Sequence, residues 1–249
     1  MFQSRAERAL CSRRRCGRGE ARMAIAGEEE IGFAGATGRL RGRVHNVSGP
    51  AWGALVLCHG RHEDMEGRLL VGLAGLASDL GLWTFRFNFA FHEAGTEPSA
   101  GHADEIADLH AAIRYARRTA KTNRIYVAGR GLGAWATVAA ATDEFAAGAI
   151  LLGLSYQTQP ERRMALERLA EFEVPTLAVV GFESDRLDLP DLQKLVALMP
   201  SVNLAVIGRA DHRLEDAKGR PMTEAVLAPC ETWLRQQKEK APRESDTLL

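Results

Sequence analysis

The sequence predicts an α/β fold in which a doubly wound, mostly parallel sheet carries helices on both faces. From residue 31 onward, short apolar runs alternate with segments of helical spacing, the pattern of repeated strand–helix units. Apolar runs such as 53–58 and 175–181 are continuous, as expected for strands buried on both faces. The 249 residues, 46% hydrophobic and 26% charged, suffice to bury one such core.

The expected elements follow one another without a long insertion, so we expect no large lid domain. The expected strands are 31–35, 40–47, 53–58, 82–88, 124–128, 146–153, 175–181 and 202–208. The expected helices are 66–80, 103–120, 132–142, 160–170, 190–198 and 221–238, with a polar loop over 89–102. We expect three regions: a disordered Arg-rich leader (1–22), a single domain (23–240) and a polar tail (241–249).

The charge balance excludes some classes of partner. The formal net charge is zero, which gives no indication of nucleic-acid binding or of a membrane surface. Residues 1–22 hold seven arginines and two glutamates but lack the apolar segment of a secretory signal. No stretch approaches the length of a membrane span, and the four cysteines lack zinc-ligand spacing. We therefore expect a cytoplasmic protein with no metal and no cofactor.

A glycine-rich turn follows the expected strand 124–128 and opens the next helix. It reads Gly129, Arg130, Gly131, Leu132 and Gly133. With an alanine following, the turn also satisfies the dinucleotide-binding pattern G-x-G-x-x-A. That reading requires an acidic residue at the end of the following strand to hold a ribose, and the strand 146–153 ends in Gly-Leu-Ser. The sequence therefore disfavours a nicotinamide cofactor.

Polar residues follow three other expected strands at the edge where ligands of such sheets bind. His59, Gly60 and Arg61 follow the strand 53–58. Asp185 follows the strand 175–181, and His212 follows the strand 202–208. Because the carboxyl ends of parallel strands meet at one edge, we expect these residues to lie near the glycine-rich turn.

Taken in order, these motifs resemble the α/β-hydrolase family, and within it the small dienelactone-hydrolase-like proteins. The resemblance covers roughly residues 40–235 and rests on LVLCHGRHED, FRFNFAFHEAG, GRGLGA and the late Asp and His. It implies that Gly131 stands where the family carries its nucleophilic serine, in the turn G-x-S-x-G. It also implies that His212 is the catalytic histidine and Asp185 its acid, with Glu183 as a competing candidate for the acid.

The same resemblance implies the rest of the site. The backbone N–H groups of Arg61 and Leu132 would form an oxyanion hole, and His59, Gly60 and Arg130 would contact a ligand. Cys58 adjoins this loop as a conceivable substitute nucleophile, but a cysteine ending a buried strand is more often a packing residue.

Three functions remain open. The first is a degenerate hydrolase that binds a small, carboxylate-bearing ligand with charge from Arg61 and Arg130. The second is an active, esterase-like hydrolase in which His212 activates a water in the space that the serine left. The third is a non-catalytic scaffold that binds a protein partner. Without a hydroxyl at Gly131, acyl-enzyme chemistry at that position is unavailable.

Overall fold

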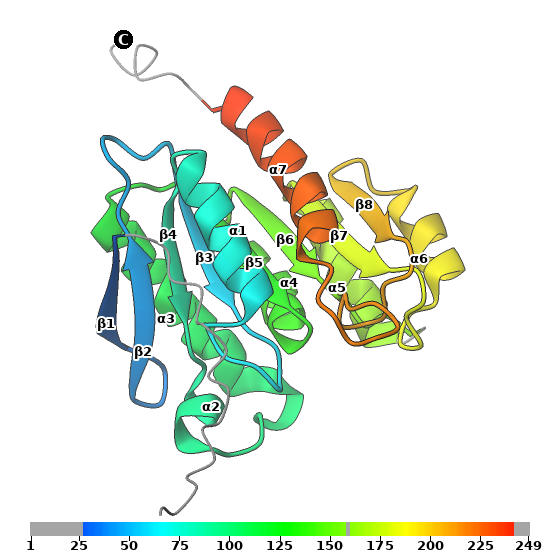
Figure 1. Ribbon diagram of the computed structural model, residues 1–249, viewed down its shortest axis with the longest axis horizontal. Helices are drawn as coiled ribbons and strands as arrows, with labels where there is room; N and C mark the ends of the chain where they lie inside the picture. Colours follow the sequence, from blue (N-terminus) through cyan, green and yellow to red (C-terminus); the bar gives the residue numbers. More distant parts are fainter. Residues whose placement is uncertain (1–26, 158–159, 242–249) are drawn as a thin grey trace, which may run out of the picture.

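The computed structural model describes residues 27–157 and 160–241. Its strands form one eight-stranded sheet in the order β1-β2-β4-β3-β5-β6-β7-β8 (Figure 1). The strands are β1 (Glu28–Ala34), β2 (Arg39–His45), β3 (Ala54–Cys58), β4 (Trp83–Phe87), β5 (Ile125–Arg130), β6 (Gly148–Leu152), β7 (Thr176–Gly181) and β8 (Val202–Ile207). β2 pairs antiparallel with β1 and β4, and the remaining pairs are parallel.

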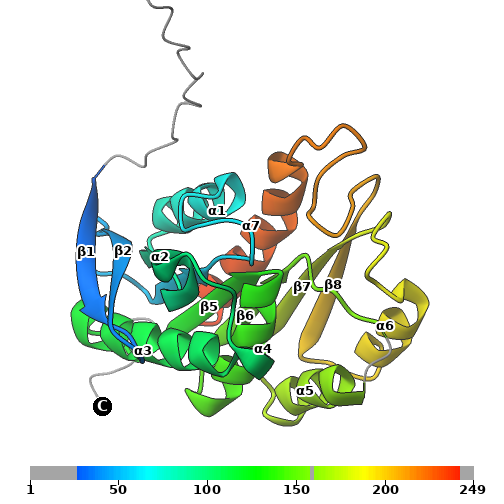
Figure 2. The same cartoon turned by 90° about the horizontal axis from the view of Figure 1, so that it is seen from below.

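Helices cover both faces of the sheet, as Figure 2 shows from below. On one face lie α1 (Arg68–Asp79) and α7 (Thr223–Glu239), which pack against each other. On the other face lie α3 (Ala103–Ala120), α4 (Leu132–Asp143), α5 (Pro160–Glu171) and α6 (Leu189–Val196). The predicted doubly wound, mostly parallel sheet is therefore confirmed.

The continuous apolar runs are explained by burial on both faces. In β3, Ala54, Val56 and Cys58 belong to the hydrophobic cluster under α3 and α4, whereas Leu55 and Leu57 belong to the cluster under α1 and α7. Each fully buried leucine contributes about 1.5–3 kcal/mol relative to an exposed one. These central strands therefore fix a rigid sheet edge, from which the loops of the site extend.

The expected loop over 89–102 contains more structure than predicted. A short helix, α2 (Ala90–Ala94), is followed by the 3-10 turn η1 (Ala100–His102). The buried carboxylate of Asp108 on α3 accepts the backbone N–H of Ala90 at 3.0 Å, and the side chain of Phe91 is buried. The prediction of a loop was wrong for these residues because a tertiary contact from α3 organises them.

Two predicted regions lie outside the described residues: the leader 1–22 and nearly all of the tail 241–249. Among the helices that the structure describes, none combines the length and apolar character needed to cross a membrane.

Candidate active site

The turn between β5 and α4 places Gly131 at a sharp elbow above the sheet edge. Its backbone has φ +54° and ψ −109°, and its N–H donates to the carbonyl of Leu152 at 2.9 Å. A non-glycine residue held in such a conformation costs on the order of 1–3 kcal/mol. A Cβ built on Gly131 meets nothing within 4 Å. A side chain at this position would therefore project into open space.

The two outer glycines of the turn are required by packing. A Cβ on Gly129 would lie 2.1 Å from the carbonyl oxygen of Gly133, and a Cβ on Gly133 would lie 2.6 Å from that of His59. Real Cβ atoms do not approach backbone atoms so closely. The start of α4 therefore packs directly against the end of β5 and the loop after β3, which only glycine allows.

His212 and Asp185 meet at the same edge of the sheet. The Nδ1 atom of His212 lies 2.9 Å from Oδ1 of Asp185. The side chain of His212 is 20% exposed and that of Asp185 is 75% exposed, so the acid lies on the solvent side of the pair. With Nδ1 bonded to the carboxylate, Nε2 is the ring nitrogen left to accept a proton, the arrangement of a histidine general base.

A tight turn after β8 presents His212. The carboxylate of Asp211 accepts the backbone N–H groups of Arg213 at 2.8 Å and of Glu215 at 2.9 Å. Leu214 adopts a left-handed conformation with φ +61° and is buried against the α1–α7 face. The loop that carries the histidine is therefore anchored on both sides of it.

The loop after β3 is held by His59. The ring of His59 is fully buried; its Nδ1 lies 2.7 Å from the carbonyl of Gly60, and its Nε2 accepts the N–H of Phe89 at 3.0 Å. Burial lowers the pKa of His59 to about 4, which keeps the ring neutral. Both ring nitrogens contact backbone groups, so this side chain positions the loop from beneath. The family resemblance implied instead that His59 would contact a ligand.

We expect the burial of His59 to make folding pH-dependent. Its pKa falls from about 6.5 in the unfolded chain to about 4 in the folded chain, so the unfolded chain binds more protons between these values. The free energy of unfolding should therefore decrease as the pH falls through this window, by up to about 3 kcal/mol, because each unit of pKa shift corresponds to about 1.36 kcal/mol. Urea unfolding at pH 7 and at pH 4.5 measures this decrease. The decrease should be smaller in His59→Gln, and an equal decrease in both proteins would contradict this role.

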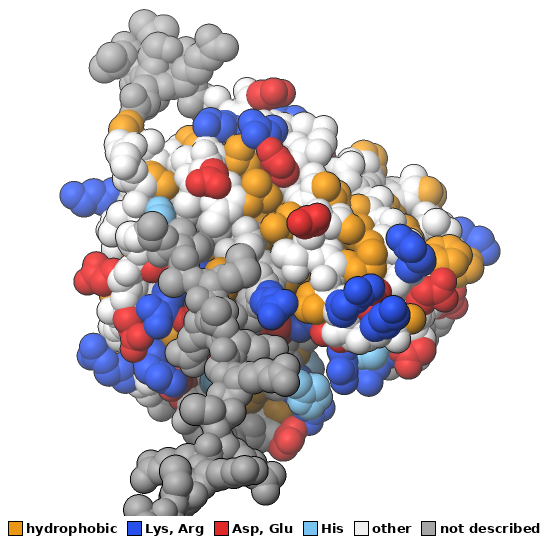
Figure 3. All heavy atoms as spheres, viewed as in Figure 1, with side chains coloured by type: hydrophobic (Ala, Val, Ile, Leu, Met, Phe, Trp, Pro, Cys, Tyr) orange, Lys and Arg blue, Asp and Glu red, His pale blue; other side chains and the backbone are white. Residues whose placement is uncertain are grey.

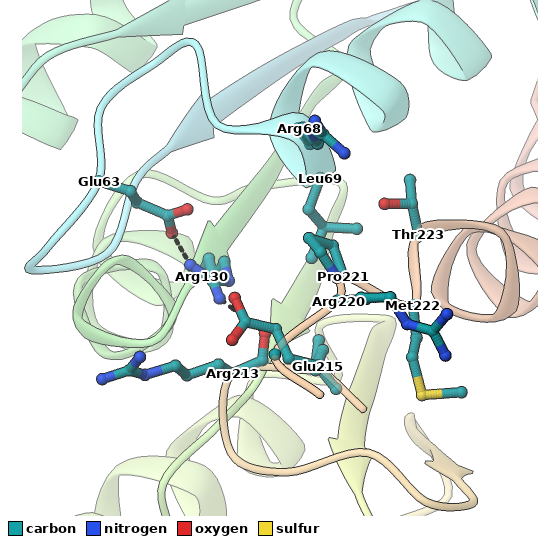
Figure 4. Close-up of a pocket in the computed structure, with 12 residues that line it drawn as sticks. Glu63, Arg68, Leu69, Arg130, Arg213, Glu215, Arg220, Pro221, Met222 and Thr223 are labelled. Carbon is teal, nitrogen blue, oxygen red and sulfur yellow. Dashed lines mark hydrogen bonds and ion pairs between the residues drawn. The ribbon is translucent and has the colours of Figure 1, made fainter. Parts of the chain in front are cut away.

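Both arginines predicted to contact a ligand are engaged within the protein. Arg61 pairs with Glu97, and both side chains are largely exposed. Arg130 lies 2.5 Å from a carboxylate oxygen of Glu63 and donates to the carbonyl of Arg213 at 2.6 Å. Figure 4 shows Arg130 directed at Glu63, and Glu63 also accepts the N–H of Gly60 at 3.1 Å. Arg130 thus ties the turn before α4 to the loops after β3 and β8.

A hollow of about 410 Å³ lies over the elbow, and we call it the elbow hollow. Its lining includes six of the eight residues that the sequence proposed: Gly60, Arg61, Arg130, Gly131, Leu132 and His212. Of the other two, His59 lies beneath the loop after β3, and Asp185 stands behind His212. The structure therefore brings six of the proposed residues together around one hollow, and their functional roles stay predictions.

A second hollow of about 560 Å³, the neighbouring hollow, adjoins it between α1 and the loop before α7. The two hollows share Glu63, Arg130, Arg213 and Glu215, so the Arg130–Glu63 pair lies between them (Figure 4). Figure 3 shows basic side chains gathered on the surface over the loop that links β8 to α7. This side of the sheet edge therefore combines acidic and basic groups.

The lining of the elbow hollow also includes residues that the sequence did not propose as ligand contacts, among them Trp135, Ser155, Arg162 and Arg186. Ser155 follows the expected strand 146–153. Arg162 lies in the expected charged helix 160–170, and Trp135 lies in the expected helix of small residues 132–142. The available signal was that Trp135 is a single large aromatic residue in the first turn of a helix otherwise made of small residues.

Cys58 does not have the environment of a nucleophile. It is fully buried, and its Sγ lies 3.6 Å from the hydroxyl of Thr137. Burial raises the pKa of this thiol to about 12, so the reactive thiolate is absent at neutral pH. The expectation that Cys58 is a packing residue agrees with this geometry.

The strand order, the elbow and the paired histidine and acid define the class of α/β proteins built on the hydrolase plan. The chain belongs to the alpha/beta hydrolase domain family, whose sequence model matches residues 52–229. A search among curated proteins finds no match.

Solved structures of similar fold include an alpha-beta serine hydrolase homologue from Coxiella burnetii (TM-score 0.68, 20% identity, covering 86% of this chain and 99% of that one). Another is a serine hydrolase without a lid from Xanthomonas campestris (TM-score 0.67, 15% identity, covering 89% of this chain and 98% of that one). A third is a dienelactone hydrolase from Anabaena variabilis (TM-score 0.66, 19% identity, covering 84% of this chain and 97% of that one). At these identities the likeness shows the fold, and the predicted hydrolase-like architecture is confirmed.

Proposed function

We propose that this chain is a hydrolase-family protein that has lost serine chemistry and retains a pocket for a small molecule. The observation that carries the proposal is Gly131. It occupies the tip of the elbow, with a backbone suited to a strained nucleophile and with open space where a side chain would stand. The elbow hollow over it has a volume of about 410 Å³, which suits a small organic ligand.

The groups around Gly131 support binding of a carbonyl or anionic end. Leu132 begins α4, so its N–H has no partner within the helix, and such amides attract negative charge. For the N–H of Arg61, the residues that the structure describes supply no acceptor. His212 also lines the hollow. What is missing for acyl transfer is the hydroxyl itself.

We expect the protein to show no esterase turnover beyond the background reaction. Deleting a serine nucleophile typically removes on the order of a million-fold of rate. The measurement is release of p-nitrophenol from p-nitrophenyl acetate by the parent protein and by His212→Ala, matched for folding by circular dichroism. Equal rates in both proteins are expected. Turnover in the parent that disappears in His212→Ala would contradict the proposal.

A second candidate is hydrolysis by a water that His212 activates. The observation that favours it is the retained pair of His212 and Asp185 at 2.9 Å, beside a space large enough to receive a water. This candidate predicts turnover that falls in both His212→Ala and Asp185→Asn and that leaves no covalent adduct on the protein. The same ester assay therefore separates the two candidates.

A further inference from the structure

Arg162 on α5 is held in a fixed orientation at the rim of the elbow hollow. Its Nη1 donates to the carbonyl of Ser155 at 2.5 Å and lies 3.0 Å from the hydroxyl of Ser155. Its guanidinium lies 4.8 Å from the ring centre of Trp135, whose indole N–H donates to the same carbonyl at 3.2 Å. The arginine is thus oriented by one aromatic ring and one serine before any ligand arrives.

Among the described residues, no carboxylate forms an ion pair with Arg162, in contrast to Arg61 and Arg130 of the same hollow. Arg61 pairs with Glu97 and Arg130 with Glu63. On the described part of α5, the ion pairs are formed by Arg163 and Arg168, and the adjacent Glu161 acts on Arg162 without an ion pair. Burial lowers the pKa of Arg162. A partly buried cation without a counter-charge is costly, and an anionic ligand would offset that cost.

A small hollow of about 190 Å³ lies beside this arginine. It is lined by Ser155, Gln157, Arg162 and Arg186. These side chains supply two guanidinium groups, a hydroxyl and an amide, and none is a carboxylate. Three of them (Ser155, Arg162 and Arg186) also line the elbow hollow together with Trp135. The small hollow is therefore an extension of the elbow hollow with the chemistry of an oxyanion site.

We propose that Arg162 and Arg186 form an oxyanion-binding subsite that receives the carboxylate or phosphate group of the ligand. The planar guanidinium matches either group through paired hydrogen bonds. The apolar body of the ligand would lie against Trp135 and Leu132, and its other end would reach Gly131. The inference rests on the proposed function, because it names the class of small molecule that the pocket takes.

The inference assigns the charged contacts to different residues from those expected at first. The sequence favoured Arg61 and Arg130, but the carboxylates of Glu97 and Glu63 already occupy them. A ligand anion would have to displace a protein carboxylate at either position. At Arg162 the anion would meet an oriented guanidinium with no competing carboxylate in the small hollow.

Isothermal titration calorimetry of the full chain tests the subsite with three probes of similar shape: benzoate, phenyl phosphate and neutral benzamide. We expect at least one of the two anions to bind tenfold or more tightly than benzamide, and the tighter anion identifies the natural group. Arg162→Gln should weaken binding of that anion by tenfold or more, consistent with the loss of charge-assisted hydrogen bonds. The matched control, Arg163→Gln, removes a neighbouring arginine paired with Glu167 and should leave the affinity unchanged.

Arg186→Gln provides a second variant, because Arg186 is exposed and its removal should not disturb folding. It should weaken binding of the same anion at least threefold. Equal affinity for anions and benzamide, binding of none of the three probes, or an anion affinity unchanged in Arg162→Gln would each overturn the subsite. Ester turnover in the parent, with anion binding still lost in Arg162→Gln, would overturn the proposed function and leave the subsite standing.

Discussion

Gly131→Ser should convert this protein into a measurable esterase. The turn that carries residue 131 is a sharp strand-to-helix elbow with φ +54°, and a Cβ there meets no atom within 4 Å. The introduced hydroxyl would face the elbow hollow, which His212 also lines with its partner Asp185 at 2.9 Å. Under the proposed function, the chain lacks only the hydroxymethyl side chain of serine at position 131 for acyl-transfer chemistry.

The expected gain is large. Because a nucleophile accounts for about a million-fold of rate in serine hydrolases, we expect hydrolysis of p-nitrophenyl acetate to rise by about 10³-fold or more over the parent. The variant should also lose about 1–3 kcal/mol of stability, since glycine adopts φ +54° without strain and serine does not. Steady-state kinetics and chemical denaturation measure the two effects.

Two controls separate the hydroxyl from the backbone. Gly131→Ala introduces the same strain without the hydroxyl, so it should show the loss of stability and no gain of activity. The double variant Gly131→Ser with His212→Ala should lose most of the gain, because the histidine activates the hydroxyl. A folded Gly131→Ser protein with the parent's rate would show that more than the nucleophile is missing from the site.

Gly129→Ala should be the most destabilising substitution in the turn. Its Cβ would lie 2.1 Å from the carbonyl oxygen of Gly133 and 2.5 Å from the hydroxyl oxygen of Thr137. The closest atom is backbone at the start of α4, so the helix would have to move away from β5. We expect a loss of about 3 kcal/mol or more, at the upper end of overpacking effects.

Gly208→Ala is the matched control for this prediction, because a Cβ there meets nothing within 4 Å. Its effect should stay within about 0.5 kcal/mol, as for ordinary surface substitutions. Urea unfolding of both variants and the parent gives the comparison. Similar stabilities for Gly129→Ala and Gly208→Ala would mean that α4 does not pack against β5 as described.

Much of this architecture could be predicted because it depends on short-range patterns in the sequence. Continuous apolar runs mark strands covered on both faces, and the turn residues that follow them fall at one sheet edge. Gly131, Asp185 and His212 were located by this reasoning together with the resemblance to a family. In the structure Asp185 and His212 meet, and Gly131 lines the same hollow as His212.

The electrostatics of the site could not be predicted in the same way. Whether an arginine is available for a ligand depends on carboxylates distant in the chain, such as Glu97 for Arg61 and Glu63 for Arg130. The orientation of Arg162 depends on Trp135, a residue 27 positions earlier on another helix. Likewise, α2 forms where a polar loop was expected because Asp108 binds its first N–H. Such contacts have no local pattern in the sequence.

The most direct test of the central claim, a hydrolase frame that lacks only its nucleophile, is covalent labelling with a fluorophosphonate. A serine activated by its histidine attacks the phosphorus and displaces fluoride, which leaves one phosphonyl group on the serine oxygen. Intact-mass measurement and peptide mapping should show no adduct on the parent and one adduct at position 131 of Gly131→Ser. An adduct on the parent at another residue, or a folded Gly131→Ser protein that stays unlabelled, would contradict the account.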